Sequence, residues 1–147
     1  MHRADADSKS KGWAVRGIHH VAFAHRDSAV IDGLTGLLGL QCNEPEEGPG
    51  FVELMFPVGD AFVQTLEATG PGPVEGFVER RGPALHHVAF EVEDIDGALA
   101  DLRARGTRLV DSEARPGGAG TRVAFLHPSA CGGLLVELVQ PPDTAGR

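Results

Sequence analysis

Two stretches of the chain share one hydrophobic pattern, an alternating strand-like run followed by apolar residues at helical spacing. The first helical pattern covers residues 30–38 and ends at Gly39, and the second covers residues 95–102 and ends at Gly106. An acidic residue precedes each pattern, as is typical of a helix N-terminus. Each half of the chain therefore predicts a strand that leads into a helix.

Short strand-like runs separated by turn residues follow each predicted helix. They cover residues 40–43, 51–57 and 61–66 in the first half, and residues 107–111, 121–126 and 134–139 in the second. Between the halves, a Gly-Pro-Gly-Pro stretch at 70–73 and a short helical pattern at 74–81 predict a connector. Both halves thus predict the order strand, helix and three strands.

A five-residue repeat relates the two halves directly. The letters His-His-Val-Ala-Phe occur at residues 19–23 and again at residues 86–90. Because the same order of elements follows both copies, we interpret the chain as two copies of one βαβββ module. Folding such modules together about a pseudo-twofold axis brings equivalent positions face to face.

Length and composition predict one α+β domain with short tails. The chain has 147 residues, of which 41% are apolar and 23% are charged, which is enough for one buried core. The predicted organisation is a mobile N-terminal tail at 1–15, a single domain at 16–141 and a C-terminal tail at 142–147. Within the domain, module 1 covers about 16–68, the connector about 69–83 and module 2 about 84–141.

Charge and cysteine content narrow the expected partners and location. The formal net charge of −8 disfavours nucleic acid, because no basic stripe offsets the repulsion of phosphates. No apolar run reaches the roughly 18 residues of a membrane-spanning helix, and no signal segment opens the chain, so we expect a cytoplasmic protein without a membrane partner. Cys42 and Cys131 form no Cys-x-x-Cys pair and are interpreted as ordinary thiols.

The second histidine of each repeat lies on a different strand face from its valine and phenylalanine neighbours. Alternation along a strand places His20 with Ala22 on one face, and His87 with Ala89 on the equivalent face of the second copy. The valine and phenylalanine face suits packing on a helix, and the first histidine of each pair falls on that face. A lone strand histidine is more often structural than a ligand, but two at equivalent places in a repeat favour a metal site, since imidazole is a common metal ligand.

The final strand of each module offers an oxygen donor to such a pair. These donors are Gln64 and Glu137, and a carboxylate in an apolar strand is costly unless a cation or hydrogen bonds compensate it. Glu53 is a further carboxylate in an apolar strand. Each of the three also has a plain structural interpretation, as a solvent-facing strand residue. Two imidazoles with two oxygen donors suit a divalent ion such as Mn²⁺, Co²⁺, Ni²⁺, Zn²⁺ or Fe²⁺.

The paired modules and the segments around these residues resemble the vicinal oxygen chelate superfamily with its glyoxalase-like fold, and within it the methylmalonyl-CoA epimerase family. The resemblance spans about residues 17–140. Its most specific segments lie at the end of the chain, at residues 125–128, 131–133, 135–138 and Gln140. Residues 51–55, 82–90 and 93–96 are also similar to the family.

The resemblance implies an eight-stranded, cleft-containing mixed sheet, and four metal ligands: His20, Gln64, His87 and Glu137. It also implies that Glu53 and Glu137 act as the acid/base pair in an isomerase. Such an enzyme would epimerise methylmalonyl-CoA or a similar acyl-CoA through an enolate stabilised by Co²⁺ or Mn²⁺, and we expect a homodimer.

Two departures from the epimerase pattern leave other members of the superfamily open. Residues 34–39 lack the usual aromatic pair, and Ser129 stands where many epimerases have a lysine. The arginines that could replace this cation toward a coenzyme A phosphate are Arg80, Arg81, Arg115 and Arg122. The alternatives are a glyoxalase I-like lyase, another metal-dependent member of the superfamily, and a metal-free antibiotic-binding protein. The absence of tyrosine disfavours an extradiol dioxygenase.

Overall fold

A computed structural model describes residues 12–143, so most of the predicted N-terminal tail and part of the C-terminal tail lie outside the described residues. The described residues fall into two compact units. One contains residues 19–88, and the other contains the residues before 19 together with those from 89 onward. The predicted domain and module boundaries stay predictions.

The strands of the first repeat pair with one another in the 19–88 unit. Strand β1 (Val15–His25) enters this unit and pairs in parallel with β4 (Ala61–Ala68), which pairs antiparallel with β3 (Phe51–Val58). Strand β2 (Glu46–Gly48) adds to the far side of β3. These four strands and the helix α2 (Ala29–Asp32) make up the predicted first module.

The connecting helix α3 (Pro73–Arg81) covers the alanine-bearing face of β1, contrary to the sequence prediction. The core of this unit contains Ala22 and Ala24 together with Leu66, packed against apolar side chains of α3. The prediction placed a helix on the valine and phenylalanine face and left the alanine side open. The prediction was wrong because it considered the strand pattern alone. The connector forms the helix α3, and this helix packs on the face of β1 that carries the smaller apolar side chains.

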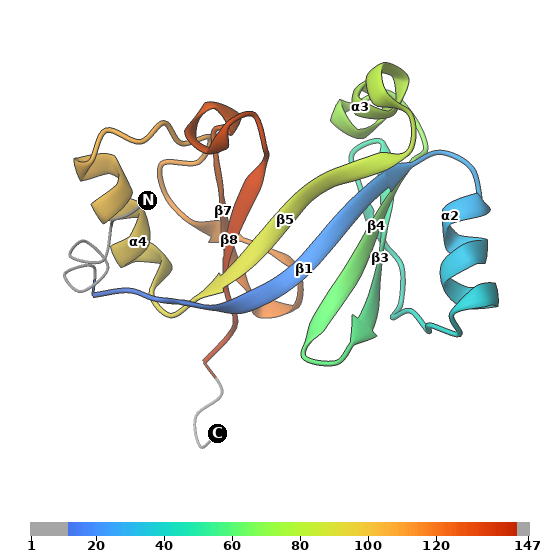
Figure 1. The fold of residues 1–147 in the computed structure, drawn as a ribbon, viewed down its shortest axis with the longest axis horizontal. Helices are drawn as coiled ribbons and strands as arrows, with labels where there is room; N and C mark the ends of the chain where they lie inside the picture. The colour runs from blue at the N-terminus through green and yellow to red at the C-terminus, as the bar shows by residue number, and fades with distance from the viewer. Residues whose placement is uncertain (1–11, 144–147) are drawn as a thin grey trace. The chain divides into compact units, whose positions relative to one another are not determined.

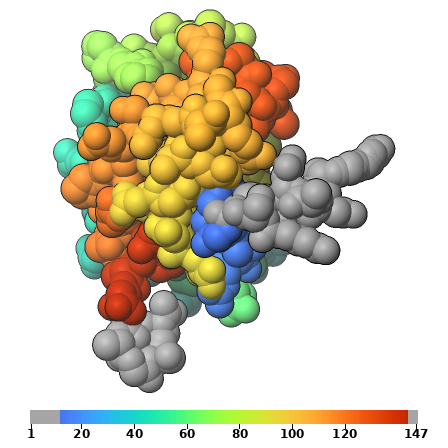
Figure 2. Space-filling model, turned by 90° about the vertical axis from the view of Figure 1, so that its left-hand side faces the viewer, coloured from blue at the N-terminus to red at the C-terminus, as the bar shows by residue number. Residues whose placement is uncertain are grey.

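The second unit has its own helix and its own core. It contains the last four residues of β5 (Ala84–Val92), then α4 (Ile95–Ala104), β6 (Arg115–Pro116), β7 (Arg122–Leu126) and β8 (Val136–Gln140). Helix α4 begins as predicted, because Asp94 accepts a hydrogen bond from the backbone N–H of Gly97. Its buried side chains pack on Val92, on the face where the sequence predicted helix packing. Residues of α4 form part of the gold surface in Figure 2.

The strands form one eight-stranded mixed sheet in the order β2-β3-β4-β1-β5-β8-β7-β6. Each repeat contributes a strand, a helix and three further strands, and α3 lies between the repeats in sequence (Figure 1). The α+β class and the two βαβββ modules are therefore confirmed.

Two predicted strands differ from the structure, one in position and one in extent. The strand predicted at 40–43 is found at Glu46–Gly48, directly before a two-residue Pro-Gly turn that sets its register with β3. The strand predicted at 107–111 is reduced to a single bridge between Leu109 and Leu126. The ladder ends there because the Asp111 carboxylate accepts the hydrogen bond from the Phe125 N–H that a neighbouring strand would have accepted.

The first predicted helix also differs from its pattern. Only Ala29–Asp32 is α-helical, and residues 33–37 continue as a π-helical turn in which the Leu38 N–H bonds to the Gly33 carbonyl. The wider turn shifts the side chains that follow. As a result Leu37 and Leu38 are 85% and 67% exposed, where the pattern predicted a buried face.

Candidate metal centre

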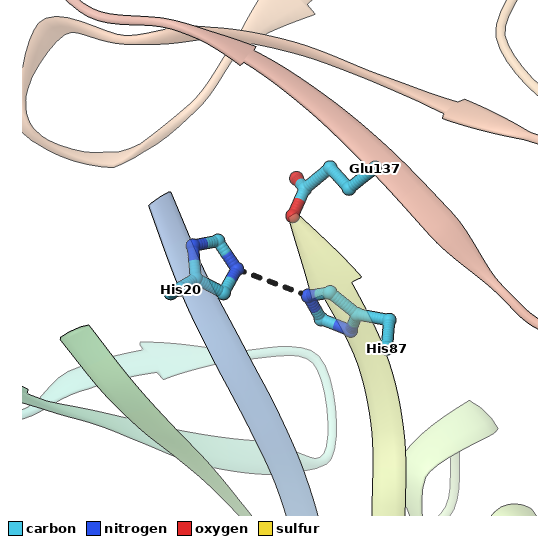
Figure 3. Close-up of side chains that lie close together, drawn as sticks. All are labelled: His20, His87 and Glu137. Atoms are coloured by element: carbon cyan, nitrogen blue, oxygen red, sulfur yellow. Dashed lines mark hydrogen bonds between the residues drawn. The ribbon is translucent and has the colours of Figure 1, made fainter. Parts of the chain in front are cut away.

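The second histidines of the two repeats meet inside the 19–88 unit. His20 on β1 and His87 on β5 are both buried, and their Nε2 atoms lie 3.1 Å apart. Their ring planes are inclined at 79°, and Figure 3 shows the two nitrogens facing one another. The sequence prediction that the repeat brings these two imidazoles together is correct.

Each of these histidines also contacts the first histidine of its own repeat. The Nδ1 atoms of His19 and His20 lie 2.9 Å apart, and those of His86 and His87 lie 2.8 Å apart. Strict alternation along a strand places the first histidines on the opposite face and therefore does not predict these contacts. The signal that could have found them is the doubled histidine, which occurs in both repeats.

Glu137 supplies a carboxylate to the same group. It lies on β8 and is buried, and its ligand oxygen and the ligand nitrogens of His20 and His87 all lie within 4.8 Å of one another. Figure 3 shows the carboxylate directed toward the imidazoles. Of the predicted ligands, the structure thus brings these three together.

Gln64 lies on β4 in register with Ala22, so its side chain shares the strand face of His20. The side chain is buried, and its Oε1 atom has no hydrogen-bond partner among the described residues. An amide oxygen left in this state costs free energy unless a cation or a donor satisfies it. The role of Gln64 as a ligand stays a prediction, and its unsatisfied oxygen fits that role.

The spacing of the two imidazoles fits a shared metal ion. Two nitrogens bound at about 2.1 Å and at right angles to one another lie about 3.0 Å apart. The observed Nε2–Nε2 distance is 3.1 Å. With one carboxylate and no thiolate, the donor set is of the kind that first-row divalent ions accept. The residues therefore fit a divalent metal site.

The structure places Glu53 on β3, half-buried and outside the group of three ligands. Its register partners are Leu66 on β4 and Glu46 on β2, and Met55, two residues further along β3, pairs with Gln64. Residues paired across adjacent strands project from the same face, so Glu53 shares the face of Gln64. Its predicted catalytic role stays a prediction.

Two of the four candidate arginines are held by carboxylates. Arg122 donates two hydrogen bonds to Asp96, at 2.7 and 2.9 Å, and Arg115 contacts Asp111 at 3.2 Å. The hydrogen bond from Arg122 holds the pKa of the Asp96 carboxyl below its usual value, and the same bond raises the pKa of Arg122. Arg80 and Arg81 lie exposed in the last turn of α3.

Comparison with known proteins agrees with this fold and this donor set. A family model described as glyoxalase/bleomycin resistance protein/dioxygenase superfamily matches residues 19–125. The chain belongs to this superfamily. Among the described residues, no helix has the length and hydropathy needed to cross a membrane.

Members of the superfamily named as epimerases resemble the chain over most of its length. An ethylmalonyl-CoA/methylmalonyl-CoA epimerase of Cereibacter sphaeroides is 35% identical over 84% of this chain and 96% of its own. The crystal structure of methylmalonyl-CoA epimerase from Mycobacterium tuberculosis superimposes with a TM-score of 0.81 at 32% identity, covering 88% of this chain and 90% of that one. A methylmalonyl-CoA epimerase in complex with methylmalonyl-CoA and NH4+ gives a TM-score of 0.79 at 31% identity, covering 87% and 96%.

Proposed function

We propose that the chain is a metal-dependent epimerase that interconverts the (R) and (S) forms of methylmalonyl-CoA or a similar 2-substituted acyl-CoA. The observation that carries the proposal is the buried group of His20, His87 and Glu137, with ligand atoms within 4.8 Å of one another. The names of the relatives, one of them solved with methylmalonyl-CoA, support the substrate class.

The proposed metal ligands are His20, Gln64, His87 and Glu137. The proposed ion is Co²⁺ or Mn²⁺, and metal analysis of the purified protein distinguishes these from Ni²⁺, Zn²⁺ and Fe²⁺. A divalent ion bound there supplies Lewis-acid stabilisation of negative charge that develops on substrate oxygens. The unsatisfied amide oxygen of Gln64 and the 3.1 Å distance between the Nε2 atoms of His20 and His87 support this ligand set.

Inversion at the α-carbon requires two proton-transfer groups on opposite sides of the substrate. We assign these roles to Glu137 and Glu53, one of which removes the α-proton while the other returns a proton to the opposite face. Their roles exchange in the reverse reaction. Each such transfer contributes about 10²- to 10⁴-fold to the rate. The shared strand face of Glu53 and Gln64 supports the assignment of Glu53.

The test is exchange of the α-proton of methylmalonyl-CoA with deuterated solvent by Co²⁺- or Mn²⁺-loaded enzyme. Wild type exchanges both epimers, whereas Glu137→Gln abolishes the exchange. Glu53→Gln loses epimerisation but retains exchange of the one epimer whose proton faces Glu137. Glu46→Gln, which alters the carboxylate opposite Glu53 on β2, is the matched control and keeps wild-type rates.

Three results would contradict the proposal. Metal-loaded wild type that exchanges no acyl-CoA would remove the substrate assignment, and turnover of a glutathione hemithioacetal instead would indicate a glyoxalase I-like lyase. Protein that binds no divalent ion would indicate a metal-free binding protein. Exchange of both epimers by Glu53→Gln would remove Glu53 from the mechanism.

We also propose that the protein is a cytoplasmic homodimer. Leu37 and Leu38 are large apolar side chains left exposed by the π-helical turn, which supports self-association through that region. Cys42 and Cys131 are free thiols, which supports a reducing compartment. Sedimentation of wild type against Leu38→Lys measures the first point, because the charged variant should sediment as the lighter species.

A further inference from the structure

We propose that His19 and His86 are positioning residues that set the tautomer and the ring orientation of His20 and His87 for metal binding. The inference rests on the proposed function, because it assumes that His20 and His87 bind the metal. His19 and His86, the first histidine of each pair, are not among the proposed metal ligands, and this inference gives them a role.

The geometry is the same in both repeats. His19 meets His20 through the two Nδ1 atoms at 2.9 Å, and His86 meets His87 through the two Nδ1 atoms at 2.8 Å. The ring centroids are 5.1 Å apart in each pair, with interplanar angles of 77° and 76°. With the 3.1 Å contact between His20 and His87, the four imidazoles form one continuous chain. Two copies of one arrangement indicate a shared requirement rather than a local accident.

Metal binding fixes the protons along this chain. A neutral imidazole carries one proton on its two nitrogens, so a histidine that binds an ion through Nε2 keeps its proton on Nδ1. His20 and His87 face each other through Nε2, and both must therefore donate from Nδ1 to the neighbouring histidine. His19 and His86 must then accept at Nδ1 and carry their own protons on Nε2. Contacts of this kind orient ligating histidines in metal sites generally.

Aromatic side chains from two different elements hold the positioning histidines in place. The His19 ring lies 5.4 Å from the ring of Phe62 on β4, and the His86 ring lies 4.8 Å from the ring of Phe77 on α3. His19 and His86 are half-buried, while the histidines that they contact are buried. These ring contacts hold His19 and His86 in place, so the Nδ1 atom of each stays fixed beside His20 or His87.

The experiment measures metal affinity and tautomers rather than turnover. Titration with Co²⁺ alone, followed by its visible absorption, gives the dissociation constant of wild type, His19→Leu and His86→Leu. Because leucine offers no acceptor, each variant should bind Co²⁺ about 10- to 100-fold more weakly. His19→Asn and His86→Asn place an amide oxygen near the lost Nδ1 and should restore most of the affinity. His127→Asn removes a half-buried histidine that caps the 128–131 turn and is the matched control with unchanged affinity.

A second measurement does not depend on the variants folding. Long-range proton–nitrogen NMR spectra of Zn²⁺-loaded wild type report which ring nitrogen of each histidine carries the proton. We expect the proton on Nδ1 in His20 and His87, and on Nε2 in His19 and His86. Thermal unfolding of the metal-free variants separates a loss of fold from a loss of affinity.

The outcomes distinguish this inference from the function on which it rests. Wild type that binds neither Co²⁺ nor Zn²⁺ overturns both. Wild type that binds Co²⁺, together with leucine variants of equal affinity, overturns the positioning role alone. A proton on Nδ1 of His19 or His86 in the Zn²⁺-loaded protein does the same, because that nitrogen could not then accept. Weaker binding by the leucine variants with recovery in the asparagine variants supports it.

Discussion

Replacing Gln64 with leucine should change stability in opposite directions with and without metal. The Gln64 side chain is 7% exposed, and its Oε1 atom has no hydrogen-bond partner among the described residues. An unsatisfied buried polar group costs about 1–3 kcal/mol. Leucine has a similar size and no polar atom, so Gln64→Leu should raise the free energy of unfolding of the metal-free protein by about that amount.

The metal-loaded protein should show the reverse effect. At an ion concentration of about 1,000 times the dissociation constant, binding stabilises the wild-type fold by about 4.1 kcal/mol. If losing one ligand weakens binding about 100-fold, the same concentration stabilises the variant by only about 1.4 kcal/mol. The increment that metal adds to stability should therefore fall by about 2.7 kcal/mol.

Urea denaturation in EDTA and in excess Co²⁺ measures both quantities on the same samples. Thr65→Val is the matched control. Thr65 is 1% exposed, and its Oγ1 atom also lacks a partner among the described residues. Its side chain projects from the other face of β4, away from the face of the candidate ligands. This control should gain stability in EDTA by removal of an unsatisfied hydroxyl and keep the full metal increment. A wild-type metal increment in Gln64→Leu would refute the ligand role, and a less stable metal-free variant would refute the argument from the unsatisfied oxygen.

Three further predictions concern the stability of the fold. Leu99→Ala removes a side chain that is 1% exposed in the core under α4 and should lower the free energy of unfolding by about 2–5 kcal/mol, measured by urea denaturation. Gly50→Ala should lower the free energy of unfolding by more than the roughly 1–2 kcal/mol expected for Gly59→Ala. Both glycines have positive φ, but only at Gly50 would a Cβ lie 2.4 Å from a backbone oxygen. Equal losses of stability in the two variants would contradict this. Asp96→Asn should cost at most about 1 kcal/mol near neutral pH, because the ion pair with Arg122 is exposed. Folding lowers the pKa of Asp96, so the stability difference between wild type and Asp96→Asn should be complete above the ordinary pKa of 3.8 and disappear as pH falls through the lowered value. A stability difference that grows on acidification would contradict this linkage.

Much of the fold follows from short-range patterns. Strands β3, β4 and β7 and helices α3 and α4 begin and end within a few residues of their predicted positions. Their periodicity, caps and turns are properties of neighbouring residues, so they can be read locally. The predictions failed where a side chain or a turn, rather than the apolar pattern, decided the pairing of a strand. The Asp111 side chain ended a strand pairing, and a Pro-Gly turn placed β2 later than its apolar letters indicated.

The candidate site divides in the same way. The repeated letters and strand alternation predicted that His20 and His87 share a site, and the misplaced charge of Glu137 predicted a third ligand; the structure brings these three together. Alternation also placed His19 and His86 on the opposite strand face, yet their Nδ1 atoms contact the candidate ligands. That contact depends on side-chain torsions, which the alternating strand pattern does not fix.

The sequence by itself determined the two βαβββ modules, the residue types available to a metal ion and the superfamily, because these depend on local periodicity, on a repeat and on matching segments. Only the tertiary structure decided that α3 packs on the alanine face of β1, that Leu37 and Leu38 face outward, and that four imidazoles form one hydrogen-bonded chain. The physical reason is that strand register, helix packing and ring orientation are set by contacts between residues far apart in the chain. Which of those contacts form depends on the free energy of the whole folded chain relative to other compact arrangements, and a local pattern does not contain that information.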